Sequence, residues 1–380
     1  MKILLVGEYS RLHNSLKEGL VALGHEVTIV GTGDGFKQYG TDYSIAPRHF
    51  ENSGALQTLR RAVYKLTKLD LERTEKGLRF YRLLPKFKEY DHVQLINSDA
   101  LETHPTIAKW LLKKLFKKNK GISLLVCGDE TPVVNYCLGG KFKYSILTPY
   151  LNNKSLKKEY AYTLKYIGKA HRNLFNFVEQ HSESIITSDI DYEIPMQQTG
   201  YKTQLIPNPI NTTAITFTPL TITKKIIVFL GINRNSYIKK GIGYFEEALA
   251  VIRKKYTESV EIIITENMPY NKYIKLYDSA HIILDQVYAY DQGYNALEAM
   301  AKGKVVFTGA ETEFMQHYNL TERVAVNALP NKDTIVMELS YLIENTAEII
   351  AMGQRARLFV EKEHDYIKIG RRYLDTWQIK

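Results

Sequence analysis

The residues best suited to chemistry follow a short apolar run in the second half of the chain. The run Ile282–Leu284 predicts a buried strand, and Asp285 and Gln286 come directly after it. Gly293 then opens a predicted helix that carries Glu298. The free N–H groups and dipole of a helix N-terminus attract phosphate, and a carboxylate behind them can accept hydrogen bonds from ribose hydroxyls. The pattern therefore indicates a nucleotide site, for which the same segment offers three more ligands: Tyr290, Tyr294 and Asn295.

A basic loop follows another predicted strand, which begins the second half of the chain. Its candidate ligands are Gly231, Asn233, Arg234 and Lys240, and Lys239 could take the place of Lys240. A pair of cations in such a loop can hold a diphosphate and neutralise the charge that develops on a leaving group. The alternative is an ordinary solvated basic loop.

Candidate residues also follow strands predicted in the first half. The exit loop of the first strand contains Gly7, Tyr9, Ser10 and His13, and the fourth strand delivers Asp129. A carboxylate at this place could position an acceptor hydroxyl or take its proton. The alternatives are a turn cap for Asp129 and a locally hydrogen-bonded histidine for His13.

Short apolar runs alternate with amphipathic stretches along the whole chain, which predicts βαβ units and parallel sheets. The expected strands are 3–6, 26–30, 93–96, 123–126, 184–187, 203–206, 226–230, 260–264, 281–284, 305–307 and 324–326. The expected helices include 56–69, 76–88, 105–118, 154–180, 242–254, 270–279, 293–301, 311–318 and a stretch from 334 to 377 with a break near His364.

A threonine-rich stretch without amphipathic period divides this alternation into two halves. Residues 212–224 are therefore predicted to be a linker between domains 1–211 and 225–362. Residues 363–380 are expected to form a terminal helix that could pack back on the first domain. The predicted fold class is α/β, with two Rossmann-like domains that face a central cleft. Ligands of such sheets bind beyond the carboxyl ends of the strands.

Composition narrows the class of protein. The chain has 380 residues, with 51 Lys and Arg against 41 Asp and Glu, and a formal charge of +10. This excess suits an anionic partner such as a nucleotide phosphate, an acidic lipid surface or nucleic acid. Cys127 and Cys137 are the only cysteines, which favours a reducing compartment. No apolar run approaches 18 residues. We therefore expect a cytoplasmic protein.

Several chemistries lack their sequence signatures. The chain has no pair of histidines at zinc-binding spacing, no CxxC, no Walker phosphate loop and no Gly-x-Ser-x-Gly elbow. The basic residues belong to no recognised nucleic-acid-binding module. We therefore expect no metal, no cofactor and no nucleic-acid partner.

Residues 285–306 resemble the nucleotide-binding signature of retaining glycosyltransferases of the GT-B fold, family 4. The signature of that family has two glutamates eight residues apart. Glu298 matches the second, whereas Tyr290 stands at the first position. The resemblance implies that Glu298 binds ribose hydroxyls and that Arg234 and Lys240 bind the diphosphate. Pro207–Pro209 resembles the interdomain turn of the family.

The resemblance implies a function as well as a fold. The second domain would bind a nucleotide sugar, and the first would present a sugar or lipid-linked acceptor. The expected reaction is retaining transfer in the synthesis of a bacterial surface polysaccharide, lipopolysaccharide or glycoconjugate, with basic residues and helix dipoles in place of a metal. The departure at Tyr290 leaves an alternative, a non-catalytic homologue that binds a nucleotide sugar for regulation or assembly.

The predicted helix 105–118 combines apolar and basic residues. We expect it to rest on an anionic membrane at the inner face, because basic residues near such a surface contribute about 1 kcal/mol each. Its apolar residues are Trp110, Leu111, Leu112, Leu115 and Phe116, and its lysines are Lys109, Lys113, Lys114, Lys117 and Lys118. The alternative is a helix whose apolar stripe packs on the sheet of the first domain.

Overall fold

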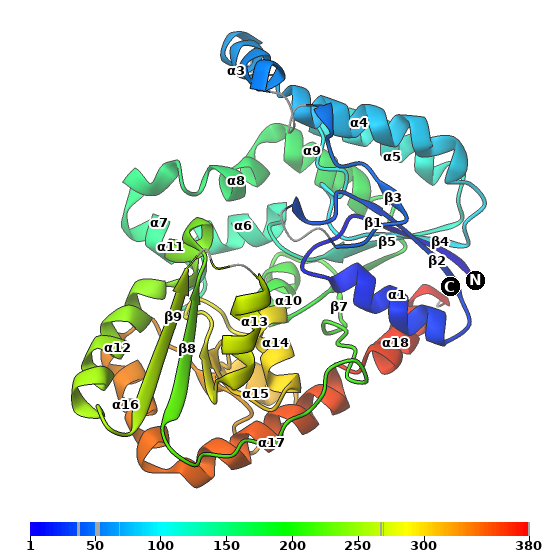
Figure 1. The fold of residues 1–380 in the computed structure, drawn as a ribbon. Coiled ribbons are helices and arrows are strands. Elements are labelled where there is room, and N and C mark those ends of the chain that lie inside the picture. Colours follow the sequence, from blue (N-terminus) through cyan, green and yellow to red (C-terminus); the bar gives the residue numbers. More distant parts are fainter. Residues whose placement is uncertain (36–38, 50–53, 68, 267, 269, 379–380) are drawn as a thin grey trace.

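Two parallel β-sheets organise the computed structural model, which describes residues 1–35, 39–49, 54–67, 69–266, 268 and 270–378 (Figure 1). The strand order in the first sheet is β3-β2-β1-β4-β5-β6-β7, and in the second it is β12-β11-β10-β8-β9. The first sheet contains β1 Lys2–Val6, β2 Glu26–Gly31, β3 Tyr43–Ser44, β4 His92–Leu95, β5 Gly121–Val126, β6 Ser184–Thr187 and β7 Gln204–Leu205. The second contains β8 Ile226–Ile232, β9 Val260–Glu266, β10 Ile282–Leu284, β11 Val305–Thr308 and β12 Val326–Asn327.

Helices cover these sheets and fill the segments between them (Figure 1). Those of the first half are α1 Leu12–Ala22, α3 Gly54–Thr67, α4 Leu71–Leu83, α5 Pro105–Phe116, α6 Thr131–Leu138, α7 Thr148–Asn152, α8 Ala161–Leu164, α9 Lys169–Glu179 and α10 Ile190–Gln198. Those of the second half are α11 Tyr237–Lys240, α12 Ile242–Lys255, α13 Tyr270–Ser279, α14 Tyr294–Ala301, α15 Thr312–His317, α16 Lys332–Glu344, α17 Thr346–Glu363 and α18 Tyr366–Gln378.

Each sheet reverses its strand order at one place, and ligands of doubly wound sheets bind there. In the first sheet the reversal lies between β1 and β4, and in the second between β8 and β10. The loops that leave β8 and β10 carry the two nucleotide-site motifs. Parallel pairing therefore brings these motifs to one edge, as their sequence positions predict.

The C-terminal helix α18 packs against α1 of the first domain (Figure 1). Gly19 and Gly370 allow the close approach, since a Cβ on Gly19 would lie 2.1 Å from the Tyr366 carbonyl oxygen. Trp377 stacks on His92, with ring centroids 4.4 Å apart. The last helix therefore completes the core of the first domain.

The expected single helix 154–180 is wrong. The segment contains the 3₁₀ turns η3 Lys154–Lys157 and η4 Lys165–Ile167 around α8, and α9 begins only after Gly168, whose backbone is extended (φ −70°, ψ 148°). Tyr160 and Tyr166 are both fully buried. On one continuous helix they would point about 120° apart, so the broken path lets both rings enter the core.

Helix α5 also differs from one expectation. Its residues Leu111, Leu112, Leu115 and Phe116 are at most 8% exposed and belong to the first-domain core. The prediction that these four side chains face a membrane is wrong, because the sheet beneath α5 needs an apolar cover. Trp110 is different, with 48% of its surface exposed. No helix in the described part of the chain is long and apolar enough to cross a bilayer.

The Gly19 contact is testable. Gly19→Ala should lower the free energy of unfolding by about 1–3 kcal/mol, because the added methyl group overpacks the α1–α18 contact. This loss should exceed the gain that alanine brings through its higher helix propensity. Chemical denaturation provides the measurement. Gly54→Ala in α3 is the control, because a Cβ there has no atom within 4 Å. Equal effects of the two substitutions would contradict the proposed role of the close contact.

Candidate active site

Asp285 is the centre of the polar cluster at the second sheet edge. Its side chain is 2% exposed and accepts hydrogen bonds from Lys240 Nζ at 2.7 Å and Asn295 Nδ2 at 3.0 Å. Thr308 Oγ1 lies 3.4 Å from its other oxygen. Lys240 ends α11, while Asn295 is the second residue of α14, so Asp285 joins the two predicted motifs. Gln286 follows it and is half-buried.

Arg234 lies in the same basic loop as Lys240 but binds a different carboxylate. Its Nε and Nη2 lie 2.8 and 2.6 Å from the two oxygens of Glu266 at the end of β9. The guanidinium also covers the ring of Tyr237, at 4.9 Å from the centroid. Its side chain is 52% exposed. Arg234 and Lys240 are therefore held by different carboxylates, and an incoming diphosphate would compete with Glu266 for Arg234.

The start of this loop is shaped by two further predicted residues. Asn233 accepts a hydrogen bond from Asn235 N at 3.0 Å and caps the 3₁₀ turn η5 Arg234–Ser236. A Cβ on Gly231 would lie 3.0 Å from the ring of Tyr273. In this arrangement, Asn233 and Gly231 both help to set the backbone conformation of the loop.

Lys239 reaches across to the first domain. Its Nζ donates to Thr163 Oγ1 at 2.9 Å, and Thr163 Oγ1 donates to Asp129 Oδ2 at 2.6 Å. Burial raises the pKa of Asp129, and the hydrogen bond from Thr163 and the charge of Lys239 oppose that rise only in part. A half-buried carboxylate with a raised pKa is suited to accept a proton.

Glu298 lies on α14, one turn after the start of the helix. Gly293 caps this helix with an extended backbone (φ −81°, ψ 173°), and no atom lies within 4 Å of a Cβ built there. Glu298 itself is half-buried. Partial burial lowers the pKa of Arg11, but the carboxylates of Glu18 and, more weakly, Glu298 raise it overall. Arg11 and Glu298 thus come near one another across the two domains.

The exit loop of β1, which carries Arg11, has an unusual backbone conformation. Ser10 and Arg11 both have positive φ angles, 53° and 75°. A bond from Ser10 N to Asp34 Oδ2 at 2.8 Å holds this conformation. Gly7 has φ 87°, and a Cβ there would lie 2.3 Å from Ile96. Such backbone conformations cost free energy and concentrate at functional sites.

Two predicted acceptor-side residues direct polar atoms into the domain interior. His13 is fully buried, with Nδ1 2.7 Å from the Gly7 carbonyl oxygen, and burial lowers its pKa to about 4. It is therefore neutral at physiological pH and holds the loop. The buried Tyr9 hydroxyl has no hydrogen-bond partner among the described residues, and burial raises its pKa. Tyr294 donates to the Pro209 carbonyl oxygen at 2.9 Å, so it touches the interdomain turn.

The structure adds two carboxylates that we did not predict from sequence. Glu8 is fully buried, and burial raises its pKa to about 7; Asn14 binds one of its oxygens, while the other has no partner among the described residues. Asp99 lies 3.0 Å from Lys165 Nζ and 3.6 Å from both Arg73 Nη2 and His171 Nε2. Burial raises the pKa of Asp99, but these neighbours lower it overall. The sequence feature that could have identified Glu8 and Asp99 is their position just after the strands β1 and β4.

Tyr290 lies in the interface between the two domains, which we call the seam. It is 2% exposed, its hydroxyl accepts from Lys143 N at 3.0 Å, and its ring lies 4.8 Å from that of Phe142 and 5.5 Å from that of Tyr144. In this arrangement its side chain contacts the first domain. Glu311 lies in the same seam, where it accepts hydrogen bonds from Lys143 Nζ at 3.0 Å and from the Tyr144 hydroxyl.

Aspartates that are buried or half-buried join the two domains beside Tyr290. Asp191 at the start of α10 accepts from Tyr290 N and Asp291 N, each at 3.0 Å, while Asp291 Oδ2 accepts from Ile190 N at 3.2 Å. Burial raises the pKa of Asp191 to about 7 and that of Asp291 to about 6. Burial and the charges of Asp191 and Asp291 also raise the pKa of Asp189. Three neighbouring carboxylates therefore share this buried seam.

Comparison with known proteins places this geometry in context. Residues 242–375 match the model of a family described as "Glycosyl transferase-like". A search of curated protein sequences finds no match.

The fold is similar to that of several solved structures at low sequence identity. Sucrose-phosphate synthase from Thermosynechococcus elongatus has a TM-score of 0.63 at 15% identity, covering 100% of this chain and 98% of that one. HepE from Anabaena in complex with UDP-glucose has a TM-score of 0.57 at 12% identity, with 99% of each chain covered. UDP-GlcNAc 2-epimerase from Neisseria meningitidis, bound to UDP-GlcNAc, has a TM-score of 0.52 at 14% identity, with 99% of each chain covered.

These similarities confirm the predicted α/β GT-B fold and the resemblance to GT-B glycosyltransferases. The chain has a glycosyltransferase-like fold whose structural neighbours include proteins that bind nucleotide sugars. Membership of family 4 and the roles of individual site residues stay predictions. Among the described residues no group of three or more His, Cys, Asp or Glu side chains is arranged to hold a metal ion.

The buried seam predicts a pH dependence. Because their pKa values lie above the usual 3.8, the three aspartates bind more protons in the folded than in the unfolded state between about pH 4 and pH 7. The contribution of Asp191 and Asp291 to stability is therefore full below about pH 4 and is lost as the pH rises to about 7, and that of Asp189 falls in the same direction as the pH rises. Asp189→Asn should stabilise the protein at pH 8 and have little effect at pH 4.5, as measured by chemical denaturation.

Asp333→Asn is the matched control, because that side chain is 83% exposed. It should change the free energy of unfolding by less than about 0.5 kcal/mol at both pH values. A stabilisation by Asp189→Asn that is the same at both pH values would show that removal of a buried charge is not its cause.

Proposed function

We propose that this protein is a retaining glycosyltransferase that moves a sugar from a nucleotide-sugar donor to an acceptor. The observation that supports it best is the cluster of Lys240, Asp285 and Asn295 at the switch point of the second sheet. Glu298 stands one turn into the adjoining helix α14, and Asp129 stands across the seam. Donor groups would thus lie on one sheet edge and an acceptor-side carboxylate on the other.

The chemistry follows from the charges of these groups. The N-terminus of α14 and the cations Arg234 and Lys240 would hold the diphosphate and stabilise the negative charge that grows as the bond to the sugar breaks. Glu298 would accept hydrogen bonds from the ribose hydroxyls. The acceptor hydroxyl would attack from the same face as the leaving group, through an oxocarbenium-like transition state. Its proton would pass to the departing phosphate or to Asp129.

We propose a uridine diphosphate sugar as the first donor to test. HepE and the 2-epimerase, which have similar folds, are described in complexes with UDP-glucose and UDP-GlcNAc. The acceptor would be a sugar or a lipid-linked sugar in bacterial surface polysaccharide, lipopolysaccharide or glycoconjugate synthesis. The enzyme would then work in the cytoplasm, at the inner face of the membrane.

A second candidate is a non-catalytic nucleotide-sugar-binding subunit. Tyr290 favours it, since this residue replaces the first glutamate of the family 4 signature and is buried in the seam. Such a protein would bind the donor without consuming it. Turnover of the donor therefore separates the two candidates.

Donor turnover is the direct test of the proposed function. The purified protein is incubated with a panel of nucleotide sugars, and release of the nucleoside diphosphate is followed, first without and then with candidate sugar acceptors. We expect slow hydrolysis of one donor, and the same rate in EDTA, because Arg234 and Lys240 take the place of a metal ion. Donor binding without turnover would support the subunit instead. Activity that EDTA abolishes and magnesium restores would contradict the metal-free mechanism.

Glu298 provides a test of nucleotide binding alone. Glu298→Ala should weaken binding of the nucleoside diphosphate by about 1.5–3 kcal/mol, the range for hydrogen bonds to a charged group. Isothermal titration calorimetry measures the change, with the exposed Glu258→Ala as a control that should bind normally. Unchanged affinity in Glu298→Ala would place the ribose elsewhere.

A further inference from the structure

We propose that helices α3, α4 and α5 of the first domain form a surface that docks on an anionic lipid bilayer. We call it the docking face and define it by Leu66, Leu78, Tyr81, Trp110 and the exposed lysines of residues 109–118. The inference deepens the proposed function, on which it rests for its purpose, since a lipid-linked acceptor would be reached from such a surface. Its evidence is independent of the donor site.

Large apolar side chains are exposed along these helices. Trp110 and Tyr81 are each 48% exposed, and their rings lie 5.3 Å apart, so α4 and α5 present one continuous aromatic ridge. Leu78, one turn before Tyr81, is 47% exposed, and Leu66 at the end of α3 is 84% exposed. In Figure 1 α3 projects from the body of the first domain. Exposed apolar groups on neighbouring helices mark an interaction site rather than a random surface.

The segments of α3 and α5 carry charges of one sign, and the acidic residues of α4, Glu72 and Glu75, are paired with Arg60 and Arg79. Residues 103–120 contain six lysines and no acidic residue, and residues 54–67 contain three basic residues and no acidic one. Five of the lysines are exposed on α5 or directly after its end, and Lys114 Nζ lies 4.7 Å from the centre of the Trp110 ring. An amphipathic aromatic residue among lysines matches the interface of a bilayer, where rings enter the headgroup region and ammonium groups meet lipid phosphates.

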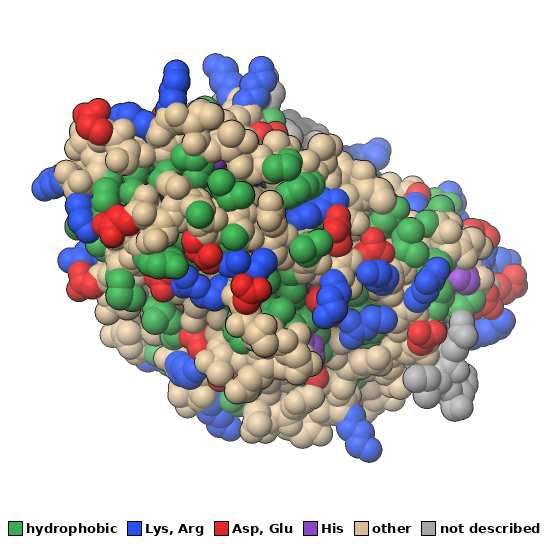
Figure 2. Space-filling view, turned by 90° about the horizontal axis from the view of Figure 1, so that it is seen from below, with side chains coloured by type: hydrophobic (Ala, Val, Ile, Leu, Met, Phe, Trp, Pro, Cys, Tyr) green, Lys and Arg blue, Asp and Glu red, His purple; other side chains and the backbone are tan. Residues whose placement is uncertain are grey.

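The opposite side of the molecule has a different surface. Figure 2 views the protein from below, away from α3, and shows acidic and basic side chains interspersed. The formal charge of the chain is +10, and residues 103–120 alone contribute +6 of it. Lys120 is paired with Asp91, whereas the other five lysines are exposed beside the apolar ridge, and an anionic bilayer is the partner that complements both features.

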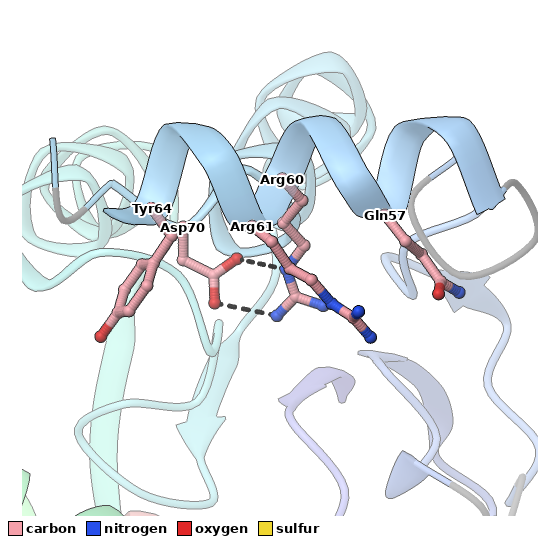
Figure 3. A pocket seen from close by; sticks show the side chains of 5 residues that line it. All are labelled: Gln57, Arg60, Arg61, Tyr64 and Asp70. Carbon is pink, nitrogen blue, oxygen red and sulfur yellow. Dashed lines mark hydrogen bonds and ion pairs between the residues drawn. The ribbon is translucent and has the colours of Figure 1, made fainter. Parts of the chain in front are cut away.

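A hollow of about 430 Å³ beside α3 adds room for a headgroup. It is lined by Gln57, Arg60, Arg61, Tyr64 and Asp70 (Figure 3). Arg60 is held by Asp70, with Nε 2.9 Å from Oδ1, whereas Arg61 is exposed and extends along the open side. Lipid phosphates could therefore meet Arg61 next to the exposed end of α3.

The docking face adjoins the acceptor side of the cleft. Arg73 in the first turns of α4 donates to the Thr103 carbonyl oxygen and lies 3.6 Å from Asp99, which follows the carboxyl end of β4. The start of α4 thus borders the strand ends at which an acceptor would be presented. A bilayer on this face would hold a lipid-linked acceptor close to that edge without any membrane span.

The test uses vesicle binding and the two tryptophans of the chain. Trp110 is exposed, whereas Trp377 is 5% exposed in the core. We expect the full-length protein to co-sediment with vesicles of phosphatidylcholine and phosphatidylglycerol, to bind less as salt rises, and to show a blue shift of tryptophan emission on binding. Vesicles of phosphatidylcholine alone should bind weakly. In Trp110→Phe the blue shift should disappear.

The matched variants isolate the charge of the docking face. Lys113→Glu/Lys117→Glu should lower the affinity for anionic vesicles by at least about 30-fold, because each basic residue near such a surface contributes about a factor of five to binding. Arg253→Glu/Lys254→Glu makes the same change of charge on α12 of the second domain, where both side chains are exposed, and should bind almost normally. Equal losses in the two variants, equal binding to neutral vesicles, or binding without the Trp110 shift would overturn the proposal.

Donor hydrolysis measured without vesicles tests the proposed function separately from the docking face. Neither double variant changes a residue of the candidate active site, so each should hydrolyse the donor at the rate of the unmodified protein. If no variant hydrolyses any donor but vesicle binding follows the expected pattern, the docking face stands and the proposed reaction fails. If hydrolysis occurs but no vesicle binds, the reaction stands and the docking face is wrong.

Discussion

Reciprocal hydrogen bonds from backbone N–H groups of each domain to an aspartate of the other hold the domains together, and the candidate active site depends on that closure. Asp191 of the first domain accepts from backbone N–H groups of the loop after β10, while Asp291 of that loop accepts from the N–H of Ile190. Asp291 is buried and Asp191 is half-buried, so each bond is strong but each charge is costly. The contact of Lys239 with Thr163 spans the same two domains. The seam therefore sets the distance between donor-side and acceptor-side groups.

The closed seam also explains why an aromatic residue is compatible with position 290. Three carboxylates already share this region, and burial raises the pKa of each of them. A glutamate at this position would add a fourth acidic group to a buried site, where like charges disfavour one another. Tyr290 instead packs against Phe142 and Tyr144 and uses its hydroxyl as an acceptor for Lys143 N. The departure from the family 4 signature thus strengthens the contact between the domains.

The βαβ arrangement could be predicted because apolar runs and strand-end polar residues are local signals. The same signals placed Asp285 and Lys240 at one edge, where the structure joins them directly. Contacts between distant segments could not be predicted in this way. The path of residues 154–180 depends on where Tyr160 and Tyr166 find space in the core, and the environment of Asp99 depends on three helices folding around it. Periodicity showed that α5 is amphipathic, but only packing shows that its leucines face inward.

Two adjacent lysines in α11 connect the halves of the candidate site. Successive residues of a helix point about 100° apart, so Lys239 and Lys240 reach different partners, Thr163 in the first domain and Asp285 in the second. Gly241 ends this single turn in the left-handed region (φ 66°), where a Cβ would lie 2.3 Å from Val287. Another residue there would be strained and would clash, and the turn that aims both lysines would shift. In the proposed reaction, a diphosphate that drew either ammonium group toward itself would act on the same turn, so donor binding would be linked mechanically to the acceptor-side carboxylate through α11.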